Sequence, residues 1–161
     1  MGLKDRDGRG QGQIAGPFLA AVPVPPTNGS PPWSDYSAGY TTNTDGTFSL
    51  TELTLAPRFP GPVPHRHREH VDSFYVLDGT LTLRLGKETV EARPGSYAVV
   101  VPGVTHTFSN PSDETVRALN VMAPGGFEQY LKEAAAATGQ GPPDPAVMTE
   151  IASRYDFEAV E

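Results

Sequence analysis

The residues of this chain best suited to chemistry are its four histidines, His65, His67, His70 and His106. His65 and His67 are two positions apart, so in an extended segment their rings project from one face, with Cα atoms ~6.7 Å apart. Two imidazoles at that separation can converge on one ion at bonds of ~2.0–2.1 Å. Because the chain has no cysteine, thiolate nucleophiles, disulfides and iron–sulfur clusters are excluded, and any metal ligands must be His, Asp or Glu.

Two further residues are candidates to complete such a site. Asp72 lies on the next expected strand and has the same parity as Phe74 and Val76, so it can supply a carboxylate from that face. His106 brings a third imidazole from a separate hairpin. The predicted metal ligands are therefore His65, His67, Asp72 and His106, and Asp72 is also the candidate catalytic base.

The segments that must position these residues have the pattern of short strands. Gly and Pro number 17 each and separate the apolar segments at regular intervals. In one segment Leu81, Leu83 and Leu85 alternate strictly with other residues, so they share a face. The expected strands cover residues 47–55, 73–77, 80–85, 89–92, 97–101, 106–109 and 116–122, with strand signals starting near Tyr40. Such a series predicts an all-β barrel or sandwich.

The pattern changes to helical after Pro124. Residues 127–138 are rich in helix formers, and Gly139 is placed to end a helix. Asp144 suits the N-cap of a second helix and Pro145 its first position. An apolar stripe follows at helical spacing, formed by Val147, Met148, Ile151, Ala152 and Tyr155. We expect this stripe to pack against the barrel, with a lid over the barrel mouth as the alternative.

These patterns predict three parts of the chain. Residues 1–32 form a flexible Gly/Pro-rich arm, residues 33–124 a β-barrel, and residues 125–161 a helical segment that packs on the barrel. A formal net charge of −7 with scattered basic residues argues against nucleic acid as a partner. The chain has no apolar run near the ~20 residues of a membrane helix and no secretory h-region. We therefore expect a cytoplasmic protein whose partner is a small, uncharged or weakly acidic molecule.

Two motifs closely resemble those of the cupin superfamily. The first is G-x3-H-x-H-x4-D-x6-G, from Gly61 to Gly79, and the second is G-x6-P-G-x2-H-x3-N, from Gly95 to Asn110. The resemblance covers residues 45–122, and a weaker similarity to bacterial quercetin dioxygenase-related cupins extends to residues 123–128 and 154–155. It implies a double-stranded β-helix (jelly-roll) barrel with a metal in its open end, bound by the residues named above. Because cupins commonly pair as dimers, the resemblance also implies a homodimer.

The sequence departs from the family pattern at Asp72, where the family usually has Glu. Asp is one methylene shorter, so its carboxylate reaches roughly 1.5 Å less far. Three alternatives stay open: Asp72 binds through a water or only orients a histidine, Glu69 or His70 takes its place, or waters complete a three-histidine site. We otherwise expect His70 to be a solvated loop residue.

Other residues near the motifs have expected roles. Arg66 and Arg68 have the opposite parity to the histidines and are interpreted as surface charges. Gly79 and Gly103 are expected in turns, and Asn110 is expected to cap a turn. The predicted substrate pocket is apolar and contains Phe74, Val76 and Phe108, with Phe59 or Tyr97 as further candidates; core packing is the alternative for all of them.

The ligand set suits one divalent transition metal, which could be Fe, Ni, Mn, Co, Cu or Zn. The first hypothesis is a metal-dependent dioxygenase similar to quercetinase, acting on a small hydroxylated aromatic or enolisable substrate. The second is a non-oxidative cyclase or isomerase of a polyketide-like or sugar-like substrate. The third is a non-catalytic cupin that binds a small ligand.

Overall fold

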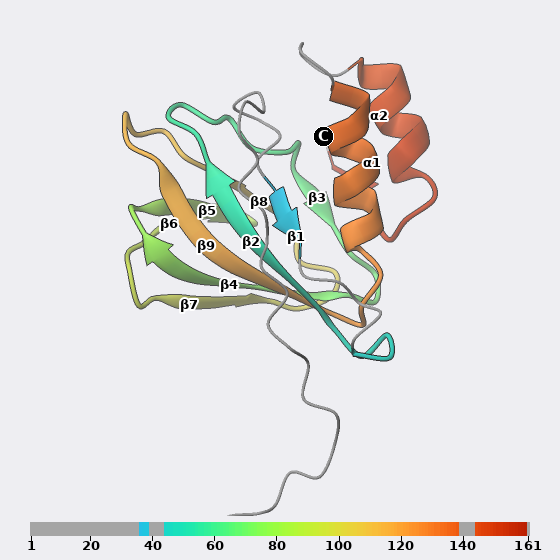
Figure 1. Cartoon of the computed structure of the whole chain (residues 1–161), viewed down its shortest axis with the longest axis horizontal. Helices are drawn as coiled ribbons and strands as arrows, with labels where there is room; N and C mark the ends of the chain where they lie inside the picture. Colours follow the sequence, from blue (N-terminus) through green and yellow to red (C-terminus); the bar gives the residue numbers. More distant parts are fainter. Residues whose placement is uncertain (1–35, 39–43, 139–143, 161) are drawn as a thin grey trace, which may run out of the picture.

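Two five-stranded antiparallel sheets face each other in the computed structural model, which describes residues 36–38, 44–138 and 144–160 (Figure 1). The first sheet has the order β1 (Tyr36–Ala38), β2 (Ser49–Leu55), β9 (Val116–Ala123), β4 (Val71–Asp78) and β7 (Tyr97–Val100). The second has the order β10 (Glu158–Ala159), β3 (His65–Arg66), β8 (His106–Ser109), β5 (Leu81–Leu85) and β6 (Glu88–Ala92). This arrangement confirms the predicted jelly-roll barrel.

The predicted strands from residue 47 onward are confirmed, with ends that differ by at most two residues. The short strands β3 and β10, which pair with each other, were not predicted. The expected flexible arm at residues 1–32 and the strand signal near Tyr40 lie outside the described residues. The division of the chain at residues 32 and 124 and the expected homodimer stay predictions.

The interior of the first sheet changes from apolar to polar along the barrel. Inward-facing residues of β2, β9 and β4 align in successive cross-strand sets two residues apart. These sets are Leu53–Ala118–Val76, then Thr51–Asn120–Phe74, then Ser49–Met122–Asp72. All nine residues are buried. The alternation that builds the strands therefore also delivers a buried carboxylate and amide to one end of the barrel.

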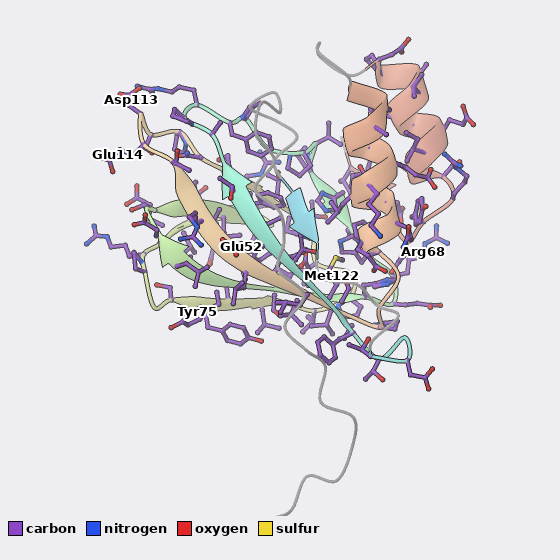
Figure 2. All side chains as sticks on the ribbon, viewed as in Figure 1. Glu52, Arg68, Tyr75, Asp113, Glu114 and Met122 are labelled. Carbon is purple, nitrogen blue, oxygen red and sulfur yellow. The ribbon has the colours of Figure 1, made fainter. Side chains whose placement is uncertain are left out.

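The apolar half of the interior joins the two sheets. Phe74 of β4 and Phe108 of β8 meet with ring centroids 5.3 Å apart, and Leu81 and Leu83 are fully buried in the same cluster. The suggestion that Tyr97 lines a pocket is wrong, because this side chain is 64% exposed. It pairs across strands with Tyr75, which projects from the outer face of the sheet (Figure 2).

The two predicted helices are present as α1 (Glu128–Thr138) and α2 (Pro145–Ala152). Asp144 caps α2, where its Oδ1 accepts a hydrogen bond of 2.8 Å from the amide of Ala146. Among the described residues, no helix has the length and apolar character needed to cross a membrane.

Both helices stand at one end of the barrel beside β3 (Figure 1). They enclose a second apolar cluster that includes Met122 of β9, Phe127, Tyr130 and Ile151, and Figure 2 shows Met122 between the barrel and α1. Four residues of the predicted stripe belong to this cluster, Met148, Ile151, Ala152 and Tyr155, whereas Val147 is exposed. Helix α2 contacts α1 in this cluster, and its packing on the barrel stays a prediction.

Asn110 ties three chain segments together after β8. Its buried Nδ2 donates to the carbonyl oxygens of Leu55, Ala56 and Glu114 at 3.1, 2.9 and 2.7 Å. Its Oδ1 accepts hydrogen bonds from the amide and hydroxyl of Ser112 at 3.1 and 2.7 Å. The predicted turn cap is thus confirmed, and the residue also holds the end of β2 in place.

We predict that Asn110→Ala lowers the free energy of unfolding by about 3 kcal/mol, because it removes every hydrogen bond of a fully buried side chain that links the end of β2 to the loop after β8. Urea denaturation followed by circular dichroism measures this loss. Ser112→Ala is the matched control and removes only the hydroxyl side of the network, so its loss is about 1 kcal/mol. A smaller loss for Asn110→Ala than for Ser112→Ala would contradict this role.

Candidate metal centre

The three imidazoles that were predicted to lie together do converge in the structure. His65 of β3 pairs with His106 of β8, and His67 follows β3 directly. Their exposed fractions are 4%, 1% and 2%, respectively. One ligand atom from each ring lies within 4.8 Å of the others, and the ring centroids are 4.4–5.2 Å apart. Residues on and next to two paired strands, β3 and β8, which are far apart in the sequence, therefore form a buried three-histidine cluster that could hold a metal ion.

The loop of the second motif contacts the first motif directly. The amide of Gly103 donates a 2.7 Å hydrogen bond to the carbonyl oxygen of His67. Before β3, the chain passes so close to β8 that a Cβ at Gly61 would lie 1.8 Å from the carbonyl oxygen of Phe108. Gly61 also has a φ of +84°, which favours glycine. These contacts position β3 and His67 against the strand that carries His106.

Each ring of the cluster has its Nδ1 beside a main-chain carbonyl oxygen. The acceptors are the carbonyls of Val63 for His65 at 2.9 Å, Val104 for His106 at 3.1 Å, and Asp156 for His67. A carbonyl oxygen only accepts, so Nδ1 carries the proton and Nε2 keeps its lone pair. Nε2 of His67 is buried and has no hydrogen-bond partner in the described part of the chain. A metal ion would supply the missing partner, so these residues fit one.

The protonation equilibria of two rings also suit a metal. Burial, together with the neighbouring His106, lowers the pKa of His65 to about 3. Burial also lowers the pKa of His67. A buried imidazole resists gaining a charge, so both rings are neutral near pH 7. Only the neutral ring binds a metal, so no proton has to be displaced from either ring.

Asp72 approaches the cluster from the opposite sheet. Its Oδ2 lies 3.3 Å from Nε2 of His106 and 3.9 Å from Nε2 of His67. Its Oδ1 accepts a hydrogen bond from Nδ2 of Asn120, which also donates to the carbonyl of Ser73 at 3.2 Å. A carboxylate oxygen and an imidazole lone pair both accept, so either a proton or a metal ion must lie between Oδ2 of Asp72 and Nε2 of His106.

The predicted four-ligand set is thus assembled in one place, although the tight cluster consists of the histidines alone. Among the described residues, the group whose ligand atoms all lie within 4.8 Å of one another does not include Asp72. The direct binding of Asp72 to a metal and its role as a base stay predictions. The same holds for the metal-ligand role of the three histidines.

His70 does not occupy the expected position in solvent. Its side chain is only 13% exposed, and its Nδ1 lies 2.8 Å from Oδ2 of Asp156. The prediction of a solvated histidine is therefore wrong, because a distant carboxylate draws the ring inward. Glu69 is exposed. Neither residue joins the cluster in place of Asp72.

Arg66 and Arg68 are surface charges as predicted, and both form ion pairs with Glu158 at 2.5 and 3.4 Å. A cavity of about 490 Å³ opens here; it is lined by Arg66, His67, Arg68, Pro102, Gly103 and Glu158. The predicted pocket residues Phe74, Val76 and Phe108 lie in the apolar core cluster and do not line this cavity.

Sequence reasoning missed the segment that closes over the histidines, residues 155–160, which we call the C-terminal strap. Phe157 stacks on His65 with ring centroids 4.3 Å apart and an interplanar angle of 13°. Burial opposes ionisation of Asp156, but hydrogen bonds from Arg68, His70 and Glu69 outweigh it and hold the pKa of that carboxyl below its usual range. No motif or periodicity marks residues 156–160, and Tyr155 was expected only as the last member of the helical stripe.

Comparisons with known proteins agree with this geometry. The family described as the Cupin domain matches residues 51–122. The chain is 29% identical over 90 residues to a quercetin 2,3-dioxygenase of Bacillus subtilis (strain 168), covering 56% of this chain and 26% of that protein. It is 34% identical over 100 residues to a quercetin 2,3-dioxygenase of Aspergillus japonicus, covering 57% and 28%. The chain thus spans about a quarter of the length of these curated relatives.

Solved structures show the same fold. A Klebsiella pneumoniae protein with a double-stranded β-helix domain superposes with a TM-score of 0.51 at 24% identity, covering 64% of this chain and 84% of that one. KdgF from Halomonas sp. gives 0.51 at 17% identity, with coverage of 58% and 81%. Residues 51–122, which match the Cupin domain family, carry all three histidines of the cluster, and the fold of the chain is that of a cupin.

Proposed function

We propose that the protein is a metal-dependent dioxygenase that binds a small hydroxylated aromatic or enolisable substrate through its hydroxyl group. The observation that carries this proposal is the convergence of three buried imidazoles, with a carboxylate 3.3 Å from one of them. The similarity to two quercetin 2,3-dioxygenases supports an oxidative reaction. Because the chain spans about a quarter of the length of those proteins, the proposal names only the chemical class of the substrate.

His65, His67 and His106 would hold one divalent ion of Fe, Ni, Mn, Co or Cu through their Nε2 atoms. Such an ion supplies Lewis acidity and open coordination positions, which lower the pKa of a substrate hydroxyl and leave room for dioxygen. The protein's own contribution is to present three lone pairs in fixed directions. The main-chain carbonyls at Nδ1 of each ring provide that orientation.

Asp72 is the proposed general base for the substrate hydroxyl. Its Oδ2 faces the Nε2 atoms of His106 and His67, so a hydroxyl bound at the same ion lies within its reach. Asn120 holds Oδ1 and so leaves Oδ2 directed at the site. Phe74 lies two residues from Asp72 on the same strand and packs on Phe108, so these two rings are the proposed apolar surface beneath the carboxylate.

A non-oxidative cyclase or isomerase is the second candidate. The observation that favours it is the same buried carboxylate, because a base beside a Lewis acid can move a proton without oxygen. Zinc, which has no redox chemistry, would serve this reaction and not the first. The metal bound after native purification therefore distinguishes the two candidates.

We predict that the untagged protein binds one divalent transition metal per chain, and that His106→Ala weakens this affinity at least about 100-fold through loss of one of three imidazoles. Elemental analysis after dialysis and titration against a chromophoric chelator measure both quantities. His70→Asn is the matched control, since it removes a histidine outside the cluster and keeps a donor for Asp156. Equal affinities for His106→Ala and the wild type would rule out the site.

We predict that the loaded protein, mixed anaerobically with a flavonol or an enediol and then exposed to oxygen, consumes one O₂ per substrate. Asp72→Asn should lower the turnover rate by about 10²–10⁴-fold because it removes the base. Asp72→Glu is the matched control and should retain activity, because it restores the residue usual at this position in cupins. An oxygen electrode follows the reaction. Product formation without oxygen uptake would replace this proposal with the second candidate.

A further inference from the structure

The C-terminal strap lies directly across the strand that carries His65. Glu158 and Ala159 of β10 pair with Arg66 and His65 of β3, and the amide of Val160 donates a 2.8 Å hydrogen bond to the carbonyl of Pro64. The strap lies outside residues 51–122, the segment matched by the cupin family. A segment from beyond the cupin domain thus forms one edge of the sheet at the metal centre.

Asp156 binds the strap to the loop after His67. Its Oδ1 accepts from the amide of Arg68 at 2.7 Å, and its Oδ2 accepts from the amides of Glu69 and His70 at 2.9 and 3.0 Å. The same Oδ2 lies 2.8 Å from Nδ1 of His70. Three consecutive main-chain donors and a ring nitrogen therefore converge on one carboxylate, an arrangement that fixes the loop backbone.

His67 depends on this strap in a way that the other two histidines do not. His65 and His106 have their Nδ1 acceptors two residues earlier in their own loops, at Val63 and Val104. The acceptor of His67 is the carbonyl oxygen of Asp156, 89 positions away in the sequence. The local chain therefore orients two rings of the cluster, while a distant segment orients the third.

The strap is in turn anchored from behind by α1. The hydroxyl of Tyr155 donates a 2.7 Å hydrogen bond to Oε1 of Glu133, and the ring of Phe157 stacks on Tyr130 at 5.1 Å. The ring of Phe157 also stacks on the ring of His65, with centroids 4.3 Å apart. Residues 156 and 157 thus lie between α1 and two histidines of the cluster.

From these contacts we infer that Asp156 is a positioning residue, which presets the Nδ1-protonated form and the orientation of His67 before a metal binds. The inference rests on the proposed metal binding at His65, His67 and His106. The side-chain carboxylate of Asp156 fixes the loop after His67, and the main-chain carbonyl of the same residue accepts from Nδ1 of His67. Neither group would be a ligand of the metal. Outer partners of this kind typically contribute about 10–100-fold to metal affinity.

The test compares Asp156→Ala with Glu158→Ala in the full chain. Both residues lie on the strap, but within the described part of the chain the side chain of Glu158 forms hydrogen bonds and ion pairs only with the guanidinium groups of Arg66 and Arg68. Asp156→Ala should weaken Co²⁺ affinity about 10–100-fold and change the visible spectrum of the Co²⁺ form. Glu158→Ala removes surface ion pairs, so its affinity should stay within about threefold of the wild type, with an unchanged spectrum.

The metal-free protein gives a second readout, which also separates this inference from the proposed function. Long-range ¹H–¹⁵N NMR of the imidazoles should show Nδ1 of His67 protonated in the wild type and in Glu158→Ala, and a mixture of tautomers in Asp156→Ala. This measurement tests the role of Asp156 even if the wild type binds no metal. Absence of metal binding by the wild type would contradict only the proposed function.

Asp156→Asn covers the case in which Asp156→Ala fails to fold. The amide keeps one acceptor oxygen for the loop, so its Co²⁺ affinity and His67 tautomer should lie between those of the wild type and the alanine variant. The inference is overturned if both Asp156 variants match the wild type in both measurements. It is also overturned if Asp156→Ala does not fold and Asp156→Asn matches the wild type in both measurements. It is equally overturned if Glu158→Ala has the same effect as the Asp156 variants.

Discussion

Three hydrogen bonds from imidazole Nδ1 atoms to main-chain carbonyl oxygens govern what this site can do. Because a carbonyl oxygen can only accept, each bond fixes one tautomer and aims the lone pair of Nε2 into the barrel. The same bonds satisfy one polar atom of each buried ring, which offsets part of the cost of burial. The main-chain carbonyls of Val63, Val104 and Asp156 therefore orient the three rings directly.

The barrel interior divides its tasks along its length. Leu53, Phe74 and Leu83 belong to the buried core that joins the sheets, whereas Asp72 and Asn120 lie at the polar end. Among the described residues, Asp72 has ion-pair contacts only to histidines. Burial lowers the pKa of His67, so this ring offers little positive charge near pH 7. A buried carboxylate without a cation is costly, and a divalent ion between Asp72 and the rings would remove that cost.

The strands and the histidine cluster could be predicted from the sequence because both depend on local periodicity. Alternation gave the faces of Leu81 and Leu83, and the two-residue spacing of His65 and His67 placed both rings on one side of the chain. Alternation alone does not say which face is inward. Tyr97 was therefore misplaced: its strand buries Val100 and exposes Tyr97 and Val99. His70 was misjudged for another reason, since its partner Asp156 is 86 positions away.

The strap shows why a boundary drawn from composition can separate residues that act together. The sequence changes from strand to helix near residue 124, and the matched cupin domain ends at residue 122. That domain supplies all three rings and the acceptors for His65 and His106, but the acceptor for His67 belongs to Asp156. Helix α1 holds the strap in place through Glu133 and Tyr130. The helical segment therefore contributes to the surroundings of the histidine cluster, because α1 contacts the strap that carries the acceptor of His67.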